Sequence, residues 1–530
     1  MTVFSQHEPT SNTAMPSSIE QLIAHDAVER LAEGDASLFS EQPEVQAAIK
    51  ARLGWVTLAS DTDSILDYLD VLREEASRLA PTDVVLIGMG GSSLSTRVIS
   101  AVFEQECREV RLHVLDTTCA QDVAKLIGRL PFETTLFIVS SKSGSTTEPI
   151  ALGDLFFERC IKELSEDGAP SHFIAITDPD TPLSITANEQ EWRHTIHARS
   201  TVGGRFSALS LFGLVPALYA GIDIERLIES AQTMENICRG EETFPNPGAQ
   251  LACFINDALE EGRDKLMLVF TERYRAFGMW LEQLIAESLG KDGKGVMPII
   301  TSPERLGTTL HPDQCVFVMR EDEDEMLASW SEKIAEMGPA KEVIINTPYD
   351  LGAEFIRWEF AVALLGFLMH VNPFDQPDVA ASKEKTKALL SGERYEANPH
   401  RIEELPSLVK PGDYICLLAY LPQASASRSA LIQIAAKLES HFGVPAIIAR
   451  GPRYLHSTGQ LYKGGPNTGV FIVVGDDKND CDVELSLRSY SMRDLFNAQR
   501  KGDIMSLIER NRRVIAADSL ESLAAFVETL

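Results

Sequence analysis

The sequence predicts an α/β protein with two doubly wound parallel sheets and a helical N-terminal extension. Three observations indicate this class: short, apolar, β-rich runs recur along the chain, small-residue loops follow several of them, and those loops open stretches with helical periodicity. Parallel sheets covered by crossover helices produce this alternation. With 530 residues, the chain exceeds the usual size of one such domain, so we expect two sheets.

The strands of the first sheet are expected at three places. Asp83–Ile87 runs into GMGGSS and a helix, residues 135–139 run into SSKSGSTTE and a second helix, and residues 172–177 add a third strand. Apolar runs of this length, bounded by small polar residues, are typical of buried strands. The later strands are expected at Lys265–Phe270 and at residues 315–319, 343–345, 415–419, 446–449 and 470–474.

We expect the chain to divide into four segments. They are a flexible tail rich in Ser, Thr and Pro over residues 1–18, a helical segment over 19–75, a first sheet domain over 76–238 and a second over 239–530. The polar stretch 239–247, which contains ETFPNP, is the expected linker between the two sheet domains. A charged break over 391–404 separates the last strand–helix units.

The composition argues against several classes of protein. The formal net charge of −30 opposes binding to nucleic acid or to anionic membranes, because both attract basic surfaces. The apolar runs are shorter than the roughly 18–20 residues that a membrane-spanning helix needs. The N-terminus lacks the basic start and apolar core of a secretion signal, so we expect a cytoplasmic protein.

The cysteines and histidines do not form a clear metal motif. Eight cysteines are scattered without a CxxC pair, which indicates reduced thiols rather than a disulfide framework or a zinc site. His194 and His197 have HxxH spacing, but they lie on an extended stretch without a nearby cysteine or acidic partner. That pattern is weak evidence for a metal, and we expect none.

The motif GMGGSS, residues 88–93, joins a predicted strand to a predicted helix. Glycines let the backbone turn sharply and let a ligand approach its N–H groups, while a helix N-terminus favours an anion. Gly90, Gly91 and Ser92 are therefore candidate anion contacts. A tight turn without a ligand explains the pattern equally well, and the spacing differs from the GxGxxG of dinucleotide-binding folds.

The loop SSKSGSTTE, residues 140–148, favours a phosphate more strongly. Hydroxyl groups, a glycine and a lysine stand between a predicted strand and a predicted helix. Hydroxyls and backbone N–H groups donate to a phosphate, and the helix dipole favours its charge. We expect Ser141, Lys142, Ser143 and Thr146 to contact it. The alternative is a helix cap rich in Ser and Thr, but a cap needs fewer donors.

From this loop onward, the chain resembles the phosphoglucose isomerase family, whose members are built from sugar isomerase domains. The shared motifs are SSKSGSTTEP, VGGRFS at 202–207, QLIAESLGKDGKG at 283–295, and NPFDQP at 372–377, which precedes Lys383 by the expected interval. They occur in the family's order and cover most of residues 80–390. The resemblance implies that both predicted sheets belong to sugar isomerase domains.

The C-terminal part departs from the family's usual order. LHSTGQ at 455–460, followed by KGG, resembles the family's ring-opening histidine segment, which normally precedes the lysine. The resemblance therefore implies that His456 opens the ring and that a strand–helix unit has moved to the C-terminus. His311 stands near the usual place, but GTTLHPDQ lacks the flanking pattern. Residues 30–55 and the C-terminal part also resemble the isomerase half of fused transaldolase/phosphoglucose isomerase proteins, although too few residues precede them for a transaldolase barrel.

Two residues match the family's groups for proton transfer. Interconverting an aldose and a ketose moves a proton between C2 and C1, and one carboxylate can act first as general base and then as general acid. Glu287, at the end of an apparent amphipathic helix, matches this carboxylate. Arg205 matches the fixed cation that stabilises charge on the enediolate oxygens.

The remaining matches concern the sugar ring and its binding. Sugar phosphates are mostly closed rings, so an acid–base pair must open them. His456 and Lys383 match that pair, Glu148 matches the glutamate that supports the histidine, and Gln376 matches a residue that holds the substrate. The resemblance implies no metal and no organic cofactor.

The resemblance implies interconversion of glucose 6-phosphate and fructose 6-phosphate through an enediol. It also implies a homodimer in which each ring-opening histidine enters the site of the neighbouring subunit. Two alternatives stay open: an isomerase for another sugar with an anionic C6 group, such as mannose 6-phosphate or a sulfosugar, and a non-catalytic sugar-phosphate sensor. The presence of all four reactive side chains, those of Glu287, Arg205, Lys383 and His456, favours an enzyme. The sequence also lacks the basic helix-turn-helix of a DNA-binding regulator.

Overall fold

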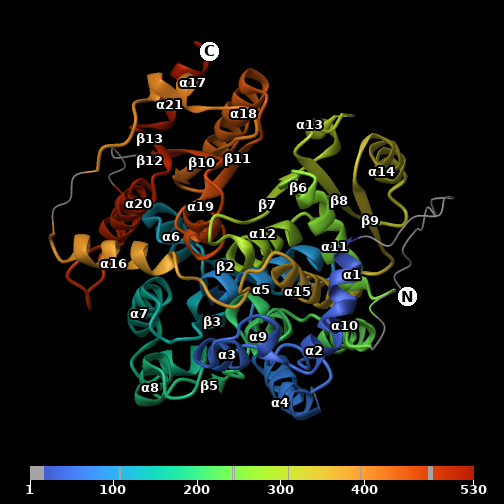
Figure 1. Ribbon diagram of the computed structural model, residues 1–530. Coiled ribbons are helices and arrows are strands. Elements are labelled where there is room, and N and C mark those ends of the chain that lie inside the picture. Colours follow the sequence, from blue (N-terminus) through green and yellow to red (C-terminus); the bar gives the residue numbers. More distant parts are fainter. Residues whose placement is uncertain are drawn as a thin grey trace.

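The computed structural model describes residues 17–530, except 62, 107–108, 241–242, 244, 308, 394–396 and 476–480. The described strands pair in parallel and form three sheets surrounded by helices (Figure 1). The predicted α/β class with parallel sheets is therefore confirmed. Among the described helices, none combines the length and the apolar character that crossing a membrane requires.

The first sheet has the strand order β2-β1-β3-β4-β5. Its central strands are buried along their whole length, which is why they read as continuous apolar runs. The edge strand β2 is half-exposed and begins with a charged residue, so the sequence did not predict it. The elements of this part are β1 (Asp83–Ile87), α5 (Leu94–Val102), β2 (Arg111–Leu115), α6 (Ala120–Ile127), β3 (Thr135–Ser140), α7 (Thr147–Leu164), β4 (Phe173–Thr177), α8 (Pro182–Glu189) and β5 (His194–His197).

The second sheet has the order β7-β6-β8-β9. The helix α15 follows it and is buried at nearly every residue, because α10, α11 and α12 pack around it. The elements of this part are α9 (Leu211–Tyr219), α10 (Ile224–Cys238), α11 (Pro247–Glu260), β6 (Lys265–Phe270), α12 (Phe277–Leu289), β7 (Met297–Thr301), α13 (Pro303–Leu306), β8 (Gln314–Glu321), α14 (Glu325–Met337), β9 (Ala340–Ile345) and α15 (Leu351–Leu368).

The third sheet has the order β11-β10-β12-β13 and occupies the orange and red part of Figure 1. We expected one sheet over residues 239–530, but the described strands there form two. The chain between β9 and β10 forms helices instead of crossing back to the second sheet. The elements are α16 (Val379–Leu390), α17 (Leu405–Leu408), β10 (Tyr414–Tyr420), α18 (Ser425–Phe442), β11 (Ala446–Arg450), α19 (Gly459–Gly464), β12 (Gly469–Gly475), α20 (Met492–Glu509), β13 (Arg513–Ala517) and α21 (Leu520–Val527).

Residues 405–530, here called the C-terminal unit, pack against both other sheets. Alternate residues of β1 face a core shared with the second sheet and a separate cluster on the other side. That separate cluster includes Leu485, Met492 and Leu495 of the C-terminal unit. Met267 and Val269 of β6 likewise face a cluster that contains residues of the third sheet. The C-terminal unit thus completes apolar cores of its own chain.

The N-terminal helices pack against the core that the first and second sheets share. They are α1 (Ser17–Ala24), α2 (Ala27–Ala32), α3 (Pro43–Lys50) and α4 (Asp63–Leu79). The expected flexible tail covers residues 1–18; residues 1–16 lie outside the described part, and α1 begins at Ser17. Part of the expected linker, at 241–242 and 244, also lies outside it, and α10 and α11 flank that stretch.

Candidate active site

The loop between β3 and α7 has the geometry of an anion site. Gly144 has φ +60°, and a Cβ there would meet the side chain of Thr181 at 2.4 Å, so the turn requires glycine. Thr146 is the N-cap of α7, and its hydroxyl accepts a hydrogen bond from Ser141 at 3.2 Å. The N–H groups of the first turn of an 18-residue helix therefore face a cluster of hydroxyls, including that of Ser143.

The ammonium group of Lys142 has partners within the protein. Its Nζ donates to Oδ2 of Asp178 at 2.6 Å and to the carbonyl of Ser200 at 2.8 Å. These contacts tie the loop after β3 to the segments that follow β4 and β5. In this arrangement Lys142 holds the loop in shape, in addition to adding positive charge near it.

The Gly90–Ser92 turn lies against two other motifs. A Cβ on Gly91 would lie 1.9 Å from the carbonyl oxygen of Gly204, so this turn and the VGGRFS segment touch through their backbones. Gly90 has φ +56°, and a Cβ on it would lie 2.9 Å both from Nε2 of Gln283 and from the carbonyl of His456. These glycines allow four motifs that are distant in sequence to meet.

Glu287, near the end of α12, lies beside Arg205. Nη2 of Arg205 is 3.6 Å from Oε1 of Glu287, and both side chains are largely buried. The guanidinium of Arg205 also donates to the side chain of Gln376 and to the carbonyls of Pro373 and Asp375. Burial lowers the pKa of Arg205, while the charges of Glu287 and Asp375 oppose this change. The NPFDQP segment thus fixes a cation next to the carboxylate.

Gln283 joins Glu287 to the histidine motif. Its Nε2 donates to Oε2 of Glu287 at 2.9 Å and to the backbone carbonyl of His456 at 3.0 Å. Gln283 lies one helical turn before Glu287 on α12, so both side chains point from the same face of the helix. The sequence places this glutamine within the motif at 283–295, but the motif alone indicates no role for it.

His456 lies at the end of a short 3₁₀ turn, Arg453–His456, after β11. Its Nε2 is 2.8 Å from Oε1 of Glu148 in the first turn of α7. Burial would raise the pKa of Glu148, but the charges of His456 and Lys383 hold it below its usual value. Lys383 is exposed on α16, near enough to act on this carboxylate.

In the described structure, His456 lies among residues of its own chain. The family resemblance implied that His456 enters the site of a neighbouring subunit, but here it contacts Glu148 and Gln283 of its own chain. The reason is the position of the C-terminal unit, which carries His456 and covers the first sheet within one chain. Arg453 reinforces this placement through its hydrogen bond to Asp116 at 3.1 Å.

Asp116 links the histidine turn to the first sheet. It is buried and accepts from Arg453 and from Arg97 of α5. Burial would raise the pKa of Asp116, but the two arginines hold it below its usual value. His311, the alternative histidine, is exposed before β8, where its backbone N–H donates to Gln314. Among the described contacts, none joins His311 to the candidate site.

Lys291 is a second residue whose contacts the sequence does not reveal. Its Nζ donates to the carbonyls of Asn372 and Asp375 and to Oδ1 of Asp375, at 2.6 to 2.7 Å. Burial and the nearby charge of Arg205 lower the pKa of Lys291 to about 8. The lysine holds the segment that in turn holds Arg205. Its place in the motif ESLGK was a signal, but the motif alone does not reveal a partner 81 residues away.

The HxxH histidines have ordinary partners. Nε2 of His194 is 2.7 Å from the carboxylate of Glu75, and Nε2 of His197 is 3.0 Å from the hydroxyl of Ser184. Within the described part of the chain, no group of three or more His, Cys, Asp or Glu side chains is arranged to hold a metal ion.

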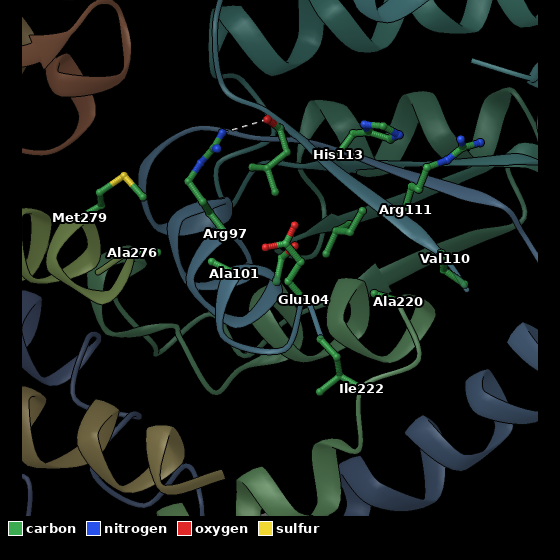
Figure 2. A pocket seen from close by; sticks show the side chains of 13 residues that line it. Arg97, Ala101, Glu104, Val110, Arg111, His113, Ala220, Ile222, Ala276 and Met279 are labelled. Carbon is green, nitrogen blue, oxygen red and sulfur yellow. Dashed lines mark hydrogen bonds between the residues drawn. The ribbon is translucent and has the colours of Figure 1, made fainter. Parts of the chain in front are cut away.

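A cavity of about 600 Å³ lies beside the edge strand β2 (Figure 2). Among the described residues that line it, none is a candidate site residue. Arg97 extends along its wall and donates to the carbonyl of Val114 at 2.9 Å. Its charge is paired with Asp116, and Arg111 and His113 of β2 are both paired with Asp83. The cationic groups that line this cavity are therefore already paired with carboxylates.

The fold and the site define a protein of the sugar isomerase domain class: parallel sheets, a hydroxyl-rich loop at a helix N-terminus, and a buried carboxylate beside an arginine. The family model for phosphoglucose isomerase matches residues 75–299. The chain belongs to the phosphoglucose isomerase family.

Two relatives agree with this family, and a solved structure shares the fold. The chain is 28% identical over 409 residues to a glucose-6-phosphate isomerase from Listeria monocytogenes, covering 66% of this chain and 89% of that protein. It is 27% identical over 381 residues to a probable glucose-6-phosphate isomerase from Methanococcus maripaludis, covering 62% of this chain and 85% of that protein. A crystal structure of a hypothetical protein from Thermus thermophilus aligns with TM-score 0.61 and 27% identity, over 71% of this chain and 98% of that one.

Proposed function

We propose that this protein is a glucose-6-phosphate isomerase, which interconverts glucose 6-phosphate and fructose 6-phosphate through an enediol. The observation that supports this most is the bridge through Gln283. One amide group binds both Glu287, the candidate base, and the backbone of His456, the candidate ring-opening group. The two chemical steps of an aldose–ketose isomerase therefore fit into one site.

The first step is opening of the sugar ring. Because a carboxylate only accepts hydrogen bonds, the contact with Glu148 places the proton of a neutral His456 on Nε2. Nδ1 is then the nitrogen that takes or returns a proton at the sugar. Lys383 is exposed toward solvent on α16 and is the proposed donor to the ring oxygen. Opening the ring presents the carbonyl that the next step requires.

The second step is proton transfer between C2 and C1. Glu287 removes the C2 proton and returns it to C1, acting as base and then as acid. Arg205, 3.6 Å from Glu287, supplies a fixed positive charge for the oxygens that gain negative charge in the enediolate. The backbone N–H groups and hydroxyls of Ser141, Ser143 and Thr146 bind the phosphate at the other end of the sugar, with Gly90, Gly91 and Ser92 nearby.

A coupled assay tests this function. We expect turnover of fructose 6-phosphate to glucose 6-phosphate, unaffected by a chelator, and much slower turnover of mannose 6-phosphate and 6-sulfo sugars. If mannose 6-phosphate or a 6-sulfo sugar is converted faster than fructose 6-phosphate, that sugar is the substrate instead. An inactive wild-type protein that still binds sugar phosphates would indicate a sensor instead.

We also propose that the chain is related most nearly to the isomerase half of fused transaldolase/phosphoglucose isomerase proteins. The order of the motifs supports this relationship, because the His456 segment follows Lys383 and comes directly after β11 of the third sheet. A homodimer, which the family resemblance implies, would then hold two sites that are each complete within one chain.

A further inference from the structure

Glu148 has a second hydrogen-bond partner that the sequence motifs do not indicate. Nε2 of Gln499 donates to Oε1 of Glu148 at 2.6 Å, and this is the same oxygen that accepts from His456. Gln499 lies on α20 of the C-terminal unit and is 3% exposed. A buried amide from the C-terminal unit and the histidine therefore share one oxygen of this carboxylate.

The orientation of the Gln499 amide is determined by its two partners. The hydroxyl of Thr118, a fully buried residue between β2 and α6, donates to Oε1 of Gln499 at 2.7 Å. A carboxylate only accepts, so the NH2 group must face Glu148 and the carbonyl must face Thr118. The result is a chain of hydrogen bonds from Thr118 through Gln499 to Oε1 of Glu148, the same oxygen that His456 contacts.

This network surrounds a carboxylate that burial would otherwise disfavour. The charges of His456 and Lys383 offset the effect of burial on the pKa of Glu148. Tyr420 and Tyr490 also interact with it, and their pKa values are raised mainly by their own burial and in part by the Glu148 charge. Gln499 is an uncharged donor. It stabilises the ionised carboxylate through a hydrogen bond and adds no second positive charge beside the histidine.

We propose that Gln499 is a positioning residue: it fixes the carboxylate of Glu148 so that this group holds Nε2–H of His456 and leaves Nδ1 available to the sugar. This inference rests on the proposed function and adds a residue that acts through Glu148 during ring opening. Loss of the amide donor lets the buried carboxylate rotate or take up a proton, and either change removes the constraint on the imidazole.

The test uses Gln499→Met, which keeps the length of the side chain but cannot donate. The matched control is Arg488→Gln, since Arg488 binds Asp154 at 2.5 Å across the same contact between the C-terminal unit and the first sheet, away from Glu148. The readouts are the enzyme-catalysed exchange between the α and β anomers of glucose 6-phosphate, measured by NMR, and kcat and KM for isomerisation.

We expect Gln499→Met to slow anomer exchange and kcat about 10- to 100-fold, because general acid–base steps contribute about 10²- to 10⁴-fold and this variant weakens but does not remove the histidine. KM should change less than about threefold, and Arg488→Gln should stay within about twofold of wild type on every readout. Anomer exchange within twofold of wild type in Gln499→Met overturns the proposal, as does an equal loss in Arg488→Gln.

A second variant keeps the test decisive if Gln499→Met folds poorly. Gln499→Glu can donate to Glu148 only while it is protonated, and two carboxyl groups in contact share a proton more readily as the pH falls. Its activity relative to wild type should therefore rise from about pH 8 to about pH 6. A constant ratio overturns the proposal. A wild type that does not isomerise glucose 6-phosphate, or a His456→Ala variant with normal anomer exchange, refutes the proposed function itself.

Discussion

Mixing two inactive variants tests whether each chain contains a complete site. Glu287→Gln removes the proposed base, and His456→Ala removes the proposed ring-opening group. His456 lies 2.8 Å from Glu148 and its carbonyl 3.0 Å from Gln283 of the same chain, so every chain in the mixture lacks one required group. Complementation between the variants should then fail.

The expected magnitudes follow from this geometry. Loss of a general acid or base costs at least about 10²-fold, so an equal mixture should retain at most about 1% of wild-type activity. If the histidine crossed to a neighbouring subunit, random pairing would make half of the dimers mixed, and each would hold one intact site. Activity would then return to about a quarter of wild type. The two arrangements differ by about 25-fold.

The assay combines differently tagged variants and monitors isomerisation together with subunit exchange by native mass spectrometry. A mixture of wild type and His456→Ala is the control, because it should show about half of wild-type activity in either arrangement. Recovery to a quarter of wild type would refute the single-chain site. If the protein remains monomeric throughout, activity of the monomer supports the single-chain site directly, and an inactive monomer contradicts it.

Three further predictions concern individual groups. Glu287→Gln should slow isomerisation at least about 10²-fold while substrate binding stays near normal, and solvent exchange of the C2 proton, followed by NMR, should stop with it. Ser143→Ala combined with Thr146→Ala should weaken binding of C6-phosphate inhibitors by roughly 1.5–3 kcal/mol for each lost hydrogen bond. Unchanged inhibition constants would show that the loop only caps the helix and does not bind the phosphate. Because the folded-state pKa of Glu148 is lower than its usual 4.5, its ionised form stabilises the fold above that value, and this contribution is lost as the pH falls through the lower folded-state value. Urea unfolding of Glu148→Gln between about pH 3 and 6 should therefore depend less on pH than unfolding of wild type; equal slopes would contradict the assignment.

The sequence was most informative where structure and chemistry are local. The strand, loop and first helical turn around Ser140–Glu148 are contiguous, so hydroxyl content and helix polarity suffice to predict an anion site there. The central strands were predicted for the same reason, since full burial requires an unbroken apolar run. The strands β2, β7 and β13 were missed, and β5 was predicted only as an extended stretch. β2 is half-exposed, β7 contains Pro298, and β13 begins with an arginine, so none of them reads as such a run.

The sequence by itself determined the α/β class and the family, and its motifs predicted a set of reactive side chains, because each motif is a short stretch whose residue types are tied to one chemical task. Only the tertiary structure decided how these stretches meet. The contact of His456 with Glu148 spans 308 residues, and that of Gln499 with Glu148 spans 351. Such contacts depend on which surface the C-terminal unit covers, and apolar burial, not local pattern, determines that choice. For this reason the sequence named the histidine, while the packing of the third sheet brought it to Glu148.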